Sequence, residues 1–135
     1  MKISNTYPPN YEEILKIFDV ADERVVMTYG DTIYNPHDLN INDNLYEHES
    51  IHAKQQKERG EEIWWDKYLA DPQFRLEQEL EAYGHQFDFV SKKEYNTKQK
   101  DGFLDELALA LSSKIYGNII SFGEARCKIR KHGKR

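Results

Sequence analysis

The sequence lacks the features that would place the protein in an oxidising compartment or across a membrane. Its 135 residues contain one cysteine, Cys127, so no intramolecular disulfide can form. It has no run of about eighteen apolar residues, the length that a membrane-spanning helix needs. Its first residues also lack the apolar segment of a secretory signal. We therefore expect a cytoplasmic protein with no membrane partner.

Basic residues are fewer than acidic residues: the sequence has 19 Lys and Arg and 24 Asp and Glu, which gives a formal net charge of -5. This balance argues against a nucleic-acid-binding protein, since such proteins neutralise phosphates with Lys and Arg. The exception is a basic tail at residues 126–135, which leaves room for a weak contact with nucleic acid. Such tails are more often simply solvated. The length fits one domain over residues 1–135.

The most specific chemistry lies at His48-Glu49-Ser50-Ile51-His52, which has the pattern H-E-x-x-H. On a helix, residues four apart share a face, so His48 and His52 can present two imidazoles to one metal ion. Glu49 can then reach a metal-bound water and take its proton. Zn²⁺ accepts such nitrogen and oxygen ligands and leaves one tetrahedral position for water in catalytic sites. The alternative is a solvated helix that carries two histidines by accident.

The motif helix is predicted to run from about residue 44 to residue 59, with Asn42 or Asp43 as its N-cap and Gly60 at its end. Before it, β-branched and aromatic residues at 24–29 and 32–34 predict a strand pair. We expect a small N-terminal antiparallel sheet or hairpin that packs on the motif helix. Its edge would either pair with an extended peptide or merely cover the helix.

A second helix, which begins at Asp71, is expected to supply a third metal ligand. Three glutamates alternate along it: Glu77, Glu79 and Glu81. They cannot share one face, because each step of two residues rotates by about 200°. Glu79 is our choice, since it shares a face with the small residue Ala82, which would let two helices approach closely. Glu81 is the second choice and Glu77 the third.

Further helices are predicted at residues 11–19, in the segment after Gly60, from residue 101 or 102 to 117, and at residues 122–131. Residues 1–9 are predicted to form an arm. Trp64 and Trp65 are adjacent on one helix, so we expect one of them to be partly exposed. Together these elements predict an α+β fold that is mainly α-helical.

With His48, Glu49, His52 and the later Glu79-Leu80-Glu81-Ala82, the chain resembles the zincin metallopeptidases. It is similar to small one-domain members, the ImmA/IrrE type and peptidase-like proteins of phages and bacteria, in which E-x-E-A follows H-E-x-x-H on a second helix. The resemblance covers roughly residues 25–90 and implies a minimal zincin-like domain. It implies a Zn²⁺ ion with His48, His52 and Glu79 as ligands and Glu49 as the catalytic base.

The expected function is therefore a zinc-dependent metallopeptidase that hydrolyses a peptide bond in a particular protein, in the host cytoplasm if the chain is a phage protein. Tyr83, His85 and Tyr116 are candidates for stabilising the oxyanion, although each of these residue types is more often structural. The alternative is a non-enzymatic phage or bacterial interaction protein that keeps a zincin fold and a structural metal site. A third hypothesis is a helical protein that binds nucleic acid or a partner through the basic tail.

Overall fold

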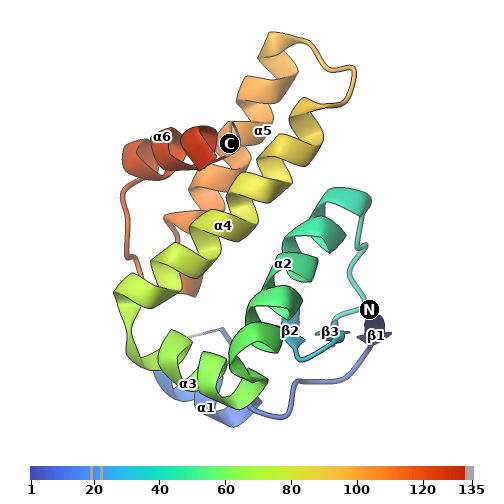
Figure 1. The fold of residues 1–135 in the computed structure, drawn as a ribbon, viewed down its shortest axis with the longest axis vertical. Coiled ribbons are helices and arrows are strands. Elements are labelled where there is room, and N and C mark those ends of the chain that lie inside the picture. The colour runs from blue at the N-terminus through green and yellow to red at the C-terminus, as the bar shows by residue number, and fades with distance from the viewer. Residues whose placement is uncertain (19, 22, 133–135) are drawn as a thin grey trace.

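The computed structural model describes residues 1–18, 20–21 and 23–132 (Figure 1). The last three residues of the basic tail therefore lie outside the described residues. Along the chain the elements are β1 (Lys2–Ser4), α1 (Tyr11–Ile17), β2 (Met27–Tyr29), β3 (Thr32–Tyr34), α2 (Asp43–Arg59), α3 (Glu61–Ala70), α4 (Pro72–Ser91), α5 (Thr97–Leu111), the 3₁₀ turn η1 (Lys114–Tyr116) and α6 (Phe122–His132). The predicted α+β class, mainly α-helical, is confirmed.

The three short strands form a mixed sheet in the order β1-β3-β2. Strands β2 and β3 form the predicted antiparallel hairpin, with Thr28 opposite Ile33 and a turn at Gly30, whose φ is 64°. Strand β1 pairs with β3 in parallel, so part of the predicted arm is a strand. The strand predicted at 24–29 pairs only at 27–29, because its partner β3 is three residues long.

Helix α2 begins and ends close to the predicted positions. The side chain of Asn42 accepts a hydrogen bond from the backbone N–H of Leu45, and the helix ends at Gly60, whose φ is 90°. Every buried side chain of α2 is polar: His48, Glu49, His52, Gln55 and Gln56. A helix normally buries an apolar stripe, so this face is organised by hydrogen bonds.

Helix α4 lies between α2 on one side and α5 and α6 on the other (Figure 1). Asp71 caps it through the backbone N–H groups of Gln73 and Phe74, as predicted for a helix that begins at Asp71. One hydrophobic cluster packs between α4, α5 and α6, and a second joins α1, α3 and the first turn of α4. Helix α4 therefore makes apolar contacts on the face that packs against α5 and α6. Its polar face, with Glu79, is directed toward α2.

Both tryptophans are buried, which contradicts the prediction that one would be partly exposed. Trp64 is 1% exposed and Trp65 is 7% exposed, with their ring planes 86° apart. The prediction failed because α3 has neighbours on two sides. Trp64 packs against His52 of α2, whereas the indole N–H of Trp65 donates to the carbonyl of Thr28 in β2. The large hydrophobic residue of this segment that is exposed is Ile63, at 63%.

Helix α5 begins at Thr97, four or five residues earlier than predicted. A reciprocal capping box between Asn96 and Gln99 fixes this start. The helix also ends earlier, at Leu111, and η1 follows where the prediction continued the helix to residue 117. None of the described helices combines the length and the apolar composition that crossing a membrane requires.

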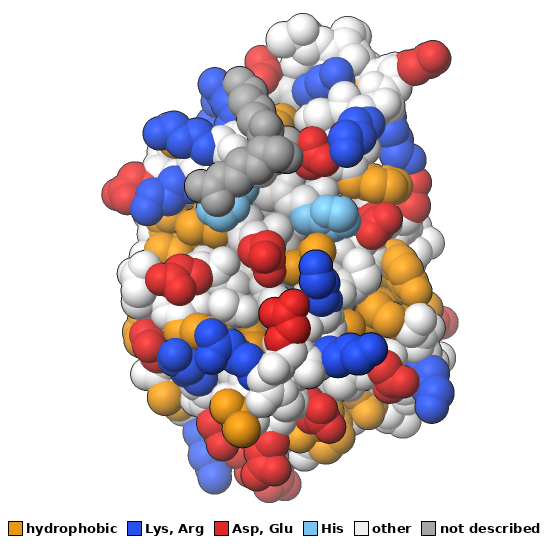
Figure 2. Space-filling view, in the orientation of Figure 1, with side chains coloured by type: hydrophobic (Ala, Val, Ile, Leu, Met, Phe, Trp, Pro, Cys, Tyr) orange, Lys and Arg blue, Asp and Glu red, His pale blue; other side chains and the backbone are white. Residues whose placement is uncertain are grey.

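On the face shown in Figure 2, acidic and basic side chains are interspersed and form no continuous basic patch among the described residues. This mixture agrees with the negative net charge of the sequence. This face therefore offers no basic surface for nucleic acid, whereas the third hypothesis, binding through the basic tail, stays a prediction.

The close approach of α4 and α6 generates a stability prediction. A Cβ at Gly84 would overlap the Cβ of His132, an atom fixed to the backbone of α6. We expect Gly84→Ala to lower the free energy of unfolding by about 1–2 kcal/mol, because overpacking outweighs the gain in helix propensity. Urea unfolding followed by circular dichroism would measure it.

Gly102→Ala is the matched control, because Gly102 also lies in a helix but has open space around it. We expect this substitution to raise the free energy of unfolding by about 0.5–1 kcal/mol. Equal effects of the two substitutions would show that the contact between α4 and α6 is not a constraint.

Candidate metal centre

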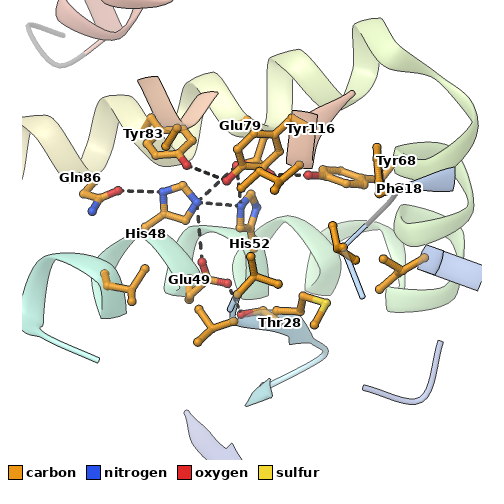
Figure 3. A pocket seen from close by; sticks show the side chains of 18 of the residues that line it. Phe18, Thr28, His48, Glu49, His52, Tyr68, Glu79, Tyr83, Gln86 and Tyr116 are labelled. Atoms are coloured by element: carbon orange, nitrogen blue, oxygen red, sulfur yellow. Dashed lines mark hydrogen bonds and ion pairs between the residues drawn. The ribbon is translucent and has the colours of Figure 1, made fainter. Parts of the chain in front are cut away.

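Three side chains from two helices converge in the pocket that Figure 3 shows. His48 and His52 lie one turn apart on α2, and Glu79 faces them from α4. The His48 Nε2 atom lies 3.2 Å from His52 Nε2 and 3.3 Å from Glu79 Oε1, and His52 Nε2 lies 3.2 Å from the same oxygen. The three residues are buried, and their arrangement could hold a metal ion.

Each histidine is anchored through its other ring nitrogen. The Nδ1 atom of His48 is 3.0 Å from Gln86 Oε1, and that of His52 is 2.9 Å from Gln55 Oε1. The amide of Gln55 can face only one way, because its Nε2 donates to the carbonyl of Gln78 and to a carboxylate oxygen of Glu81. Its Oε1 must therefore accept from Nδ1–H of His52. This leaves Nε2 as the atom for a metal.

Glu79 is anchored in the same way. The hydroxyl of Tyr68 donates to Glu79 Oε2 at 2.6 Å, which leaves Oε1 facing the histidines. Burial raises the pKa of Tyr68, and the charge of Glu79 raises it further, so the hydroxyl keeps its proton. Burial would raise the pKa of Glu79, but the charge of His52 and hydrogen bonds from both histidines outweigh it and hold that pKa well below its usual range. Glu79 is therefore an anion.

Glu49 lies beside the group without belonging to it. Its Oε1 accepts a hydrogen bond of 2.9 Å from the hydroxyl of Thr28 in β2, while its Oε2 lies 3.7 Å from His48 Nε2. Glu49 is 5% exposed, so its carboxylate lies where most water is excluded. Its inner oxygen is therefore within reach of a water molecule placed at the centre of the group.

The hairpin is joined to α2 by a second buried contact. Gln56, which is fully buried, donates to the carbonyl of Thr28 at 2.8 Å and accepts from the backbone N–H of Gly30 at 2.7 Å. Trp65 donates to the same carbonyl at 3.1 Å. The outer edge of β2 is thus already occupied at Thr28, and a peptide cannot pair with it there.

The structure separates the alternatives that the sequence left open for the third ligand. Glu79 is 3% exposed and joins the two histidines. Glu81 is exposed and holds Gln55, so it supports His52 from outside the group. Glu77 is exposed and accepts a hydrogen bond from Gln73.

The three oxyanion candidates lie in different places. The hydroxyls of Tyr83 and Tyr116 are 2.6 Å apart, and both residues line the cavity beside the group. His85 lies outside this cavity and is paired with Glu47 at 3.3 Å. Arg75, which is 3% exposed, donates to the backbone carbonyls of Tyr68, Leu69 and Tyr116 and so ties α3 to η1.

Sequence reasoning missed four residues that orient the group: Thr28, Gln55, Gln56 and Tyr68. Gln55 and Gln56 follow His52 by three and four positions, so their helical spacing placed them on the face that carries both histidines. This signal was available, but polar residues on a helix usually indicate a solvated face. Thr28 and Tyr68 carried no such signal, because only the packing of β2 and α3 brings them to the group.

The chain matches no protein-family model, and no curated protein and no solved structure shows significant similarity to it. Inferences about its chemistry therefore rest on the geometry of these residues.

The anchoring of the histidines generates a prediction about metal affinity. Gln86→Leu removes the acceptor of the His48 Nδ1–H group, so the imidazole is no longer held in orientation. We expect the affinity for Zn²⁺ to fall about 10- to 100-fold, as for other losses of a residue that orients a metal ligand. Competition with a chromophoric chelator would measure this change. Gln73→Leu, an exposed position on the same helix, is the control and should bind Zn²⁺ like the wild type.

Metal affinity should also depend on pH. Burial lowers the pKa of His52, but the charge of Glu79 outweighs burial and raises that pKa to about 9 in the metal-free protein. Below this pH, a proton must leave His52 before a metal binds. We expect the Zn²⁺ affinity to rise about tenfold per pH unit from pH 7 and to level off near pH 9. Chelator competition at several pH values would measure it, and a constant affinity over this range would contradict it.

Proposed function

We propose that the protein is a zinc-dependent peptidase. The observation that carries this proposal is the triangle formed by His48 Nε2, His52 Nε2 and Glu79 Oε1, with edges of 3.2–3.3 Å. Zinc–nitrogen and zinc–oxygen bonds are about 2.0–2.2 Å, so the ligand atoms of a tetrahedral zinc ion lie roughly 3.3–3.5 Å apart. The three atoms therefore fit one face of such a tetrahedron.

When bound, Zn²⁺ would lower the pKa of a water molecule and polarise the scissile carbonyl. Glu49 Oε2 would take the proton of the water as its oxygen bonds to the carbonyl carbon, and would pass that proton to the amine nitrogen as the C–N bond breaks. Thr28 would hold the other oxygen of Glu49, so that Oε2 keeps its direction toward the reacting atoms.

The tyrosine pair is suited to stabilise the negative charge on the carbonyl oxygen. Burial raises the pKa of Tyr83 and of Tyr116, so both hydroxyls are donors at neutral pH. One O–H lies between the two oxygens, and the other hydroxyl proton has no acceptor among the described residues. It can be directed into the cavity, which supports an oxyanion role for this pair.

The segment before β2 offers a place for the main chain of a substrate. Residues 24–26 line the cavity, and their backbone groups form no hydrogen bond with any described residue. An extended peptide could pair with these groups beside Glu49. The occupied carbonyl of Thr28 would mark the end of this contact.

The alternative, an interaction protein with a structural metal site, predicts a closed site with four protein ligands. Among the described residues, no fourth His, Cys, Asp or Glu joins His48, His52 and Glu79. A carboxylate oxygen of Glu49 and a cavity lie at the open side instead. These observations favour the peptidase over the structural site.

Metal analysis of untagged protein tests the ligand set. We expect about one zinc ion per chain, loss of that zinc in Glu79→Ala, and retention in Glu77→Ala, which alters an exposed glutamate of the same helix. Glu81→Ala, which removes an acceptor of the Gln55 amide, should keep the zinc with a lower affinity. Mass spectrometry would measure the metal content. Wild-type protein that stays metal-free after zinc is added would overturn the proposal.

Glu49→Gln tests catalysis separately from metal binding. The amide cannot accept the proton of the water, so cleavage of a library of unstructured peptides should fall at least 100-fold while the zinc content stays unchanged. Cleaved peptides would be detected by mass spectrometry. A variant as active as the wild type would exclude Glu49 as the base.

A further inference from the structure

The cavity beside the metal group, which consists of His48, His52 and Glu79, is about 340 Å³ in volume. Its walls are mainly apolar. Figure 3 shows the two histidines and Glu79 between Tyr83 and Gln86 on one side and Tyr68 and Phe18 on the other. The reacting bond of a substrate would therefore lie near the middle of the cavity, and we call the part of the cavity on each side of it a recess.

Both ends of the cavity are apolar. At the Gln86 end, Asn44 bonds to Gln86, and the adjacent Leu45 lines the wall. Leu107 and Ala110 line the part of the wall that α5 forms. At the Tyr68 end, the wall is made by Ile14 and Phe18, which pack in the same hydrophobic cluster as Tyr68. Each recess can desolvate a side chain but offers few hydrogen-bond partners.

Charge in the cavity wall is limited to the groups that the reaction needs, with one exception. Besides the histidines, Glu49 and Glu79, the only charged residue among the described lining residues is Arg24, which is exposed. Glu79 would be neutralised by a bound metal. A lysine, arginine or glutamate side chain that is buried in either recess, away from the exposed Arg24, would thus lose its hydration without gaining a counter-ion.

We infer that the protein cleaves peptides between two bulky apolar residues, one held in each recess. This inference rests on the proposed peptidase function and names its substrate class. The volume is at the lower end of the range of about 300–1,000 Å³ in which proteins enclose small ligands. It therefore fits two side chains and the bond between them, but not a folded segment. The substrate must present the bond in an unfolded or extended stretch.

The test uses zinc-loaded protein and an equimolar mixture of peptides that differ only at two adjacent positions, each Leu, Phe, Ala, Lys or Glu. Mass spectrometry would quantify cleavage between the two positions. Peptides with Leu or Phe at both positions should be cleaved at least tenfold faster than peptides with Lys or Glu at either. Cleavage that shows no such preference overturns the inference and leaves the peptidase function standing.

Ala110→Phe places a bulky side chain in the cavity wall that α5 forms and is the matched variant. At one of the two peptide positions, we expect this variant to slow the cleavage of peptides with a bulky residue at least fivefold. The preference at the other position should be the same as in the wild type. Leu109→Phe is its control, because Leu109 is the neighbouring residue on α5 but is 62% exposed and does not line the cavity. Equal profiles for the two variants would show that Ala110 does not contact the substrate and would overturn its assignment to the substrate site.

A binding measurement separates this inference from the peptidase proposal. Zinc-loaded Glu49→Gln protein would be titrated calorimetrically with N-acetyl-leucine hydroxamate and with N-acetyl-lysine hydroxamate. At least tenfold tighter binding of the leucine compound supports the apolar recesses even if no peptide is cleaved, in which case only the peptidase function fails. Equal binding without any cleavage overturns both.

Discussion

The structure depends on the burial of a helix face that is entirely polar. His48, Glu49, His52, Gln55 and Gln56 are all removed from water on α2, and each would be costly to bury without a partner, about 1–3 kcal/mol for a neutral group and more for a charged one. Their hydrogen-bond partners on other elements come from the β2–β3 hairpin and from α4. The hydrogen bonds that pack these elements around α2 therefore also orient the side chains of the metal group.

The same hydrogen bonds give each reactive group one direction. In His48, His52, Glu79 and Glu49, one polar atom is held by a neighbour and the other faces the centre. A site built in this way loses little freedom when a metal binds, since the ligands are already oriented. Arg75 fixes the backbone of two of the surrounding tyrosines, because it donates hydrogen bonds to the carbonyls of Tyr68 and Tyr116 and not to a carboxylate.

Much of this arrangement was predictable where local rules apply. The caps at Asn42 and Asp71 and the end of α2 at Gly60 follow from short-range chemistry, and the face of α4 that carries Glu79 follows from helical spacing. The parallel strand β1 and the burial of both Trp64 and Trp65 depend on neighbours distant in the sequence, so local rules could not give them. The early start of α5 was a missed local signal, because Asn96 and Gln99 form a capping box. The supporting glutamines were missed because a polar residue on a helix is usually solvated.

The contacts around the metal group join positions far apart in the chain, from Thr28 in β2 to Tyr116 in η1. During synthesis, His48 and His52 are made long before Tyr68, Glu79 and Tyr116 can reach them. A nascent chain therefore exposes two histidines and a glutamate without the groups that orient them, and the complete site forms only when most of the chain has left the ribosome. The order of synthesis thus delays assembly of the site until the surrounding fold can form.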